Sequence, residues 1–148
     1  MNPPPDEMLV SFLKALTDVV ALCNGRVHHL EVYQRDDSLA QYPCLVYEQS
    51  DDIPERELGG NVGYWTTIYS VYIIAQNSSA LRTLTDAVYT LGTETFNQSV
   101  WQQQPASYAM FEGLDVDSSS EDNEFAIEQQ ERGLKISTVS VSFQNSRC

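Results

Sequence analysis

The chain has 148 residues, of which 21 are acidic and 8 basic, so its formal net charge at pH 7 is −13. Such an acid excess excludes general binding to DNA phosphates, which requires clustered Lys and Arg. The 42 % hydrophobic content excludes wholesale disorder, and no stretch is apolar for the ~18 residues of a membrane span. The length predicts a single domain over residues 1–148. Residues 1–5 are expected to form a Pro-rich tail, and the acidic, Pro-rich start of the chain is unlike a secretion signal.

The first predicted element is an amphipathic helix over residues 6–23. Asn24-Gly25 predicts a left-handed end to it. A short strand over residues 26–32, a polar loop over 33–42 and a strand over 43–49 are expected next. Apolar side chains at three- and four-residue steps carry the helix prediction: Leu9, Phe12, Leu13, Leu16, Val20 and Cys23.

The middle of the chain contains its clearest strand, residues 64–75, which is rich in β-branched and aromatic residues. A long acidic loop over residues 50–63 is expected before this strand. After it, Asn77-Ser78-Ser79 is expected to end the strand and to cap a helix over residues 79–96. A Gln-rich connector over residues 97–105 is expected to follow that helix.

The last third of the chain predicts a strand over residues 108–116, a long acidic loop over 117–132 and a strand over 134–144, where polar and apolar residues alternate. The predicted order is therefore helix, three strands, helix, two strands. This order indicates an α+β fold, with a mainly antiparallel sheet of about five strands flanked by two helices.

No motif in the sequence predicts catalysis, a cofactor or a metal ion, so we expect a protein that is not an enzyme. His28 and His29 are adjacent in a predicted strand and should point to opposite faces, which prevents them from sharing a metal. The acidic run from Asp115 fails as an EF-hand, because Ser120 and Ala126 replace the required Gly and Glu. The three cysteines, Cys23, Cys44 and Cys148, are expected to be free thiols.

Aromatic residues are concentrated in and around the central strand, and they have two interpretations. They can form an ordinary sheet core, or they can form a surface that another subunit buries, since Tyr and Trp are enriched at interfaces. The residues concerned are Tyr47, Tyr64, Trp65, Tyr69 and Tyr72.

Five segments, in order along residues 6–96, share the residue types of a known family. They are Asn24-Gly25-Arg26-Val27; Gln41-Tyr42-Pro43-Cys44-Leu45-Val46-Tyr47-Glu48; Leu58-Gly59-Gly60; Tyr69-Ser70-Val71-Tyr72-Ile73-Ile74-Ala75; and a helix containing Leu81, Leu84, Ala87, Val88 and Leu91. This pattern resembles the tail-completion, or tail terminator, proteins of long-tailed bacteriophages.

The resemblance implies a structural virion protein at the head–tail junction, assembled in the host cytoplasm. Proteins of that family form a ring, usually a hexamer, which caps the tail tube, stops its polymerisation and joins it to the head-proximal connector. The implied partners are therefore other copies of this chain, the tail tube protein and the connector or neck protein. DNA would pass through the ring without specific binding, and acidic residues lining the lumen would repel its phosphates.

Two further functions remain as alternatives: another neck or connector component, and a soluble binding module. The long acidic loops and the start of the central strand are the expected contact regions. Arg56, Arg132 and Lys135 are rare cations that would pair with carboxylates of adjacent subunits. The full set of expected contact residues is Asp51, Asp52, Glu55, Arg56, Glu57, Tyr64, Trp65, Glu121, Asp122, Glu124, Arg132 and Lys135.

Overall fold

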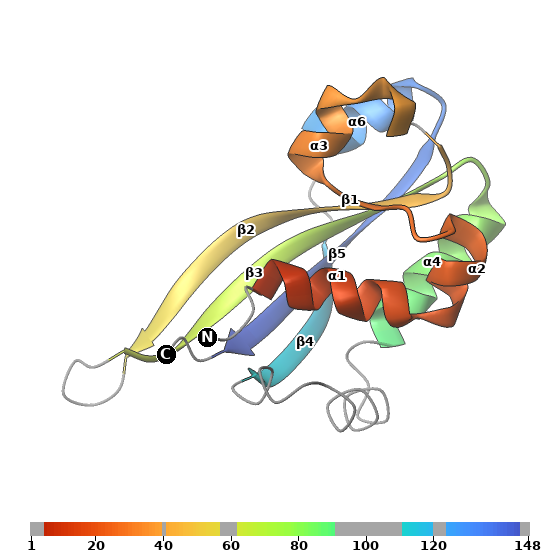
Figure 1. Ribbon diagram of the computed structural model, residues 1–148. Coiled ribbons are helices and arrows are strands. Elements are labelled where there is room, and N and C mark those ends of the chain that lie inside the picture. The colour runs from red at the N-terminus through yellow and green to blue at the C-terminus, as the bar shows by residue number, and fades with distance from the viewer. Residues whose placement is uncertain (1–4, 40, 57–61, 91–110, 120–123, 146–148) are drawn as a thin grey trace.

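A computed structural model describes residues 5–39, 41–56, 62–90, 111–119 and 124–145 of the chain (Figure 1). Its helices are α1 (Pro5–Ala15), α2 (Thr17–Cys23), α3 (Leu30–Arg35), α4 (Ser78–Tyr89) and α6 (Glu124–Glu131), with a short 3-10 turn at Asp37–Leu39. Its strands are β1 (Val27–His29), β2 (Cys44–Arg56), β3 (Val62–Ala75), β4 (Phe111–Ser119) and β5 (Lys135–Asn145).

The strands form one mixed sheet in the order β1-β2-β3-β5-β4. The four longer strands pair antiparallel, and three-residue β1 pairs parallel with residues 45–47 of β2. The predicted α+β class is confirmed. The prediction of two helices is wrong, since the described residues contain five, and the predicted five-strand count depends on including the very short parallel β1.

One face of the sheet is covered by α1, α2 and α4 (Figure 1). Full burial of a Leu or Val side chain stabilises the fold by ~1.5–3 kcal/mol, and this layer holds most of the described core. Its members come from three helices and from every second residue of the strands: Leu9, Phe12, Leu13, Leu16, Val19, Cys23, Val27, Leu45, Tyr47, Tyr69, Val71, Ile73, Leu84, Val88, Val139 and Val141.

Of the described helices, α3 and α6 cover the opposite face, at one end of the sheet (Figure 1). The residues that alternate with the first core supply this second, smaller cluster: Tyr33, Cys44, Val46, Tyr72, Ile74 and Phe125. Three predicted aromatic residues, Tyr47, Tyr69 and Tyr72, are therefore core residues of this chain. The side chains of Tyr64 and Trp65 are not among those that the structure describes.

The predicted helix over residues 6–23 is two helices, because Leu16 adopts an extended conformation (φ −71°, ψ 127°) between α1 and α2. This break shifts the helical phase. Val19 is fully buried, whereas Val20, a member of the predicted stripe, is 54 % exposed. The left-handed end is confirmed, since Asn24 has φ 50° and Gly25 has φ 76°. Cys23 of the first core and Cys44 of the second cluster are both free and buried, and burial raises the pKa of their thiols to about 11 and about 12. Cys148 lies outside the described residues.

Each of the three predicted loops contains regular structure. Residues 33–42 continue α3 and include the 3-10 turn. The acidic segment from Ser50 continues β2 as far as Arg56, because polar side chains are compatible with a strand whose outer edge and far face meet water. The segment 117–132 contains the end of β4 and the whole of α6, whose Phe125, Ala126 and Gln129 face the core at helical spacing.

Candidate interaction site

The part of the sheet that the described helices leave uncovered is a candidate interaction surface. Alternation places Ile68, Ser70, Ser140 and Ser142 opposite to the buried residues of the first core, and all four are half-buried. In the described residues, no helix packs on this area. We call the surface of β2, β3 and β5 around these four residues the open face.

Hydroxyl and carboxylate residues occupy neighbouring register positions across the open face. One row joins Glu48 of β2 to Ser70, Ser140 and, in β4, Asp117. The next row joins Asp51, Ile68, Ser142 and Asp115. Both rows therefore have a carboxylate residue at each end in the sequence. Between these ends lie two serines in the first row, and Ile68 and Ser142 in the second.

A partly buried hydrogen bond lies at the border between the open face and the end of the sheet that α3 and α6 cover. Tyr72 is 1 % exposed and belongs to the cluster under α3 and α6. Its hydroxyl donates to Oε1 of Glu48 at 2.6 Å. Ser50 Oγ also donates to the carbonyl oxygen of Ile68 at 3.2 Å, which ties β2 to β3 beside the register shift between Gln49 and Asp51. The acidic end of β2 is therefore held in the sheet.

The predicted contact residues lie at two ends of the sheet and do not form one site. Trp65 opposes Asn145, whereas Ala75 opposes Lys135, so these ends are ten residues apart along β3, about 33 Å at the ordinary rise of a strand. The backbones of Asp51, Asp52, Glu55, Arg56, Tyr64 and Trp65 belong to the first end, and Arg132 and Lys135 belong to the second. Glu57, Glu121 and Asp122 lie outside the described residues, as does the side chain of Glu124 at the start of α6.

Arg132, which follows α6 directly, contacts a carboxylate of that helix. Its Nη2 donates to Oε1 of Glu128 at 2.7 Å, and both side chains are about half exposed. A pair of this kind on a helix surface contributes only ~0.3–0.5 kcal/mol. The prediction that Arg132 pairs with an adjacent subunit therefore has a competing partner within the chain.

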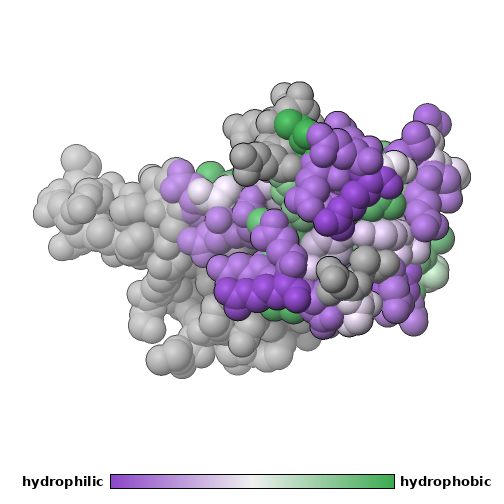
Figure 2. Space-filling view, turned by 90° about the horizontal axis from the view of Figure 1, so that it is seen from above, coloured by the Kyte–Doolittle hydropathy of each residue, from purple (hydrophilic) through white to green (hydrophobic). Residues whose placement is uncertain are grey.

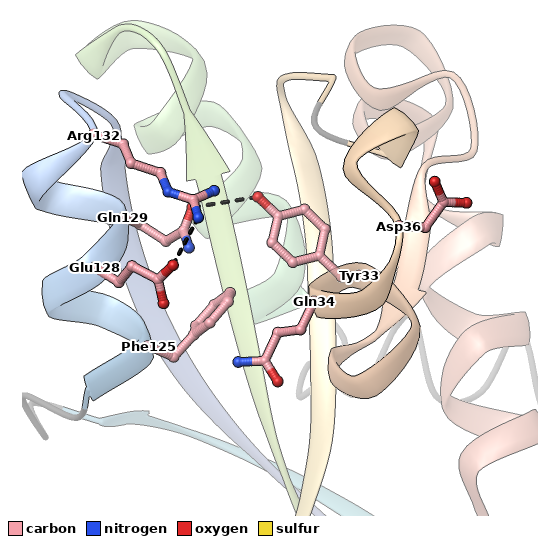
Figure 3. Close-up of a pocket in the computed structure, with 7 residues that line it drawn as sticks. All are labelled: Tyr33, Gln34, Asp36, Phe125, Glu128, Gln129 and Arg132. Carbon is pink, nitrogen blue, oxygen red and sulfur yellow. Dashed lines mark hydrogen bonds and ion pairs between the residues drawn. The ribbon is translucent and has the colours of Figure 1, made fainter.

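A small pocket lies between α3 and α6, at the covered end of the sheet (Figure 3). Its volume is about 150 Å³. Residues from both helices point toward one another across it, with Tyr33 and Gln34 on one side and residues of α6 on the other. The full lining is Tyr33, Gln34, Asp36, Phe125, Glu128, Gln129 and Arg132.

A chain of hydrogen bonds fixes the inner wall of this pocket. The hydroxyls of Tyr33 and Tyr42 are 2.7 Å apart, and the Tyr33 hydroxyl donates to Oε1 of Gln129 at 3.3 Å. Gln129 is 1 % exposed. Burial and then the hydrogen bond with Tyr42 hold the pKa of Tyr33 far above its usual range, so its hydroxyl stays protonated and able to donate.

The sequence prediction missed this pocket because residues 33–42 and 117–132 read as loops. The available signal was the spacing of Phe125, Ala126 and Gln129, which places three residues on one face of a helix. A buried Gln, however, cannot be distinguished from an exposed one by spacing alone, since its partner Tyr33 is 96 residues away.

The two adjacent histidines contact opposite sides of the sheet, as predicted. The ring of His28 stacks beside Tyr33 at 6.5 Å, whereas that of His29 meets Tyr47 edge-on at 5.3 Å. His29 Nδ1 accepts from the backbone N–H of Glu31 and so caps α3. Nε2 of His28 is buried without a hydrogen-bond partner in the described part of the chain.

Seen from above, the described surface is mostly hydrophilic, with small separate hydrophobic areas (Figure 2). Such isolated apolar side chains are normal on a protein surface. Over the described ranges, no three His, Cys, Asp or Glu residues are grouped to hold a metal ion. No helix in those ranges is long and apolar enough to cross a bilayer.

Comparison with known proteins assigns no family: no protein-family model matches the chain, and no curated protein matches it.

Proposed function

We propose that this chain is a structural virion protein, a tail terminator that forms a ring at the head–tail junction. In this role the ring caps the tail tube, stops its polymerisation and joins it to the connector. In the family that the sequence resembles, such a ring is usually a hexamer. The protein acts through contacts with copies of itself and with its neighbours, and it catalyses no reaction.

The observation that best supports this proposal is the half-covered sheet. Helices α1, α2 and α4 bury one face, while the open face presents Ser70, Ser140 and Ser142 beside a row of acidic residues. A sheet with one buried and one polar face is suited to forming the wall of a water-filled passage. Copies related by rotation would bring their open faces around a common lumen.

The charge of the open face agrees with a lumen through which DNA passes. Carboxylates repel phosphates, and the repulsion persists over about one Debye length, ~8 Å at physiological salt. Glu48 and Asp51 are described side chains of this face, and the sequence adds Asp115 and Asp117 in the paired strand β4. DNA would therefore slide past the wall without adhering to it.

A different component of the neck is the second candidate, because the same half-covered sheet would suit any ring of the head–tail junction. The position of the protein in an assembled particle separates the two.

A soluble binding module is the third candidate. The pocket between α3 and α6, of about 150 Å³, is smaller than the ~300–1,000 Å³ of ordinary small-molecule sites.

The first test is the oligomeric state of the purified chain, alone and mixed with short tubes of the tail tube protein. We expect closed rings in negative-stain electron microscopy, either free or seated on tube ends, with a mass in light scattering that is a whole multiple of 16.7 kDa. A chain that stays monomeric at high concentration and leaves the tube ends bare would contradict the proposal.

A further inference from the structure

We propose that the outer edge of β4 binds an extended, basic segment of a partner protein, which adds to the sheet as a further strand. β4 (Phe111–Ser119) ends the strand order and pairs with β5; within the described residues no strand lies beyond it (Figure 1). We call the side of β4 that faces away from β5 the β4 edge. The inference does not depend on the ring or on the role of the open face.

The hydrogen-bond register identifies the backbone groups that point out from the β4 edge. In β2, the backbone of Leu45 faces β1, because its N–H donates to the carbonyl oxygen of Arg26 at 3.0 Å. A strand residue turns its N–H and C=O toward the same neighbouring strand, and successive residues alternate. Carried through the registers of β3 and β5, this alternation directs the odd-numbered residues of β4 from Gly113 onward toward β5 and the even-numbered ones outward. The outward backbone groups are those of Leu114, Val116 and Ser118.

The opposite side of the sheet has features that block the addition of a strand. β1 pairs with residues 45–47 of β2, and a register shift follows between Gln49 and Asp51. Beyond this shift, the same alternation directs Pro54 outward, where proline offers no N–H to a further strand. Bulges, proline and charged residues, above all Lys, are the means by which edge strands avoid unwanted pairing. The outer edge of β2 is therefore protected.

The β4 edge has a regular backbone and contains neither proline nor lysine. From Gly113 to Ser119 the register with β5 is uninterrupted, and the whole strand contains no Pro, Lys or Arg. A continuous edge strand whose outward N–H and C=O groups are not blocked is a template on which an extended segment can add. The β4 edge is thus the side of the sheet that is suited to a partner strand.

The charge of β4 selects a basic partner. The strand contains the carboxylate residues Glu112, Asp115 and Asp117 and no cationic residue. Side chains directly opposite in adjacent strands have Cβ atoms about 4.5–5.5 Å apart, so opposite charges attract and like charges repel at these positions. A segment with Lys or Arg at alternate positions would place its cations next to the acidic residues of β4. The net charge of −13 would also favour the approach of such a segment.

The same charges argue against a second copy of this chain as the occupant. Pairing of two β4 strands would bring Asp115 and Asp117 close to the same acidic residues of the other copy. The outer edge of β2 would bring Asp52 and Glu55, on either side of the outward Pro54 position. Both arrangements place like charges in adjacent strands, which is destabilising. The occupant is therefore a different protein, and the segment that binds is extended and basic.

The test is amide hydrogen exchange of the ¹⁵N-labelled protein, followed by NMR. The probe is a short peptide in which Lys and Val alternate. A charge-matched control peptide replaces each Val with Pro, and an acidic control peptide replaces each Lys with Glu. In the free protein, the amides of Asp115 and Asp117, which face β5, should exchange more slowly than those of Leu114 and Val116. At saturation the Lys-Val peptide should slow exchange at Leu114 and Val116 at least about tenfold, and neither control peptide should do so.

Two substitutions at one outward position isolate the backbone contact. Ser118→Pro removes an outward N–H and leaves the ladder with β5 in place, so it should weaken binding of the Lys-Val peptide about threefold or more. Ser118→Ala retains that N–H and should bind as the unmodified chain does. If Ser118→Pro also exposes the amides of Asp115 and Asp117, the result with the unmodified chain decides. Outward amides that are already protected without peptide, no slowing by the Lys-Val peptide, or equal slowing by either control peptide would overturn the proposal.

Discussion

At the scale of single residues, His28 is the least well satisfied group in the described part of the chain. Its Nε2 is buried without a partner. Burial lowers the pKa of His28, and the positive charges of Arg26 and Lys14 lower it further, while Asp36 acts in the opposite direction. The folded protein therefore binds a proton at His28 less readily than the unfolded chain does.

This difference makes stability depend on pH. Above pH ~6.5 both states hold neutral His28 and its contribution is fully present. As the pH falls below ~6.5, the unfolded state takes up the proton first, so the free energy of unfolding decreases. His28→Phe keeps a ring beside Tyr33 and removes the titration. We expect urea unfolding between about pH 7 and pH 5 to show a smaller loss of stability in the variant.

His29→Asn is the control for that measurement. Asn retains a side-chain acceptor for the backbone N–H of Glu31 at the start of α3 and leaves His28 in place. This variant should keep the pH dependence of the unmodified chain. If the His28→Phe variant keeps that dependence too, the assignment of the titration to His28 is wrong.

At the scale of elements, the segment Asn77-Ser78-Ser79 was predicted to cap a helix, and the structure identifies Asn77 as the cap of α4. Asn77 Oδ1 accepts from the backbone N–H of Ala80 at 2.8 Å. Asn77→Ala removes this acceptor and should lower the free energy of unfolding by about 1 kcal/mol. Gln76→Ala, one residue earlier and also exposed, should change it by less than about 0.5 kcal/mol in the same denaturant titration. Equal effects of the two substitutions would remove the cap as the cause.

Elements were predictable where local pattern and tertiary burial agree. The strand β3 is rich in β-branched and aromatic residues, and β5 alternates polar and apolar residues, so both were recognised from composition and period. The helix α4 was recognised from its cap and its stripe of Leu84 and Val88. For these elements the predicted and observed ranges overlap through most of their described length.

The elements that were missed depend on contacts distant in sequence. The acidic end of β2 is a strand because β3 pairs with it through Arg56, although its composition is typical of a loop. The helix α6 has few apolar residues and is held through Phe125 and Gln129 by Tyr33 and Tyr72. The pocket between α3 and α6 was unpredictable for the same reason, since neither of its two walls was expected to be helical.

At the scale of the whole molecule, the sheet separates an apolar helix layer from a polar surface. The net charge of −13 by itself excluded general DNA binding. The open face gives part of that charge a definite place, with Glu48 and Asp51 beside a row of small hydroxyl residues. In the proposed ring, this placement would permit DNA to pass close to the protein without adhering.

Reversing the charge of the open face tests that role. Ser70→Lys together with Ser140→Lys adds two positive charges in one row of the face. We expect rings that still assemble but retain DNA in a salt-dependent way, and an infectious titre at least about tenfold lower per assembled particle. Gln76→Lys with Gln130→Lys adds the same charge at exposed positions away from this row and should leave the titre unchanged. Equal titres for the two double variants would contradict a lumen formed by the open face.

The most direct test of the terminator role is the length of tails assembled without this chain. Electron microscopy of particles from a phage that lacks the gene, with and without the chain supplied in trans, measures that length. Without the chain we expect tails of variable, extended length that fail to join heads, and with the chain supplied we expect a return to one length. Tails of one normal length that join heads in its absence would contradict it.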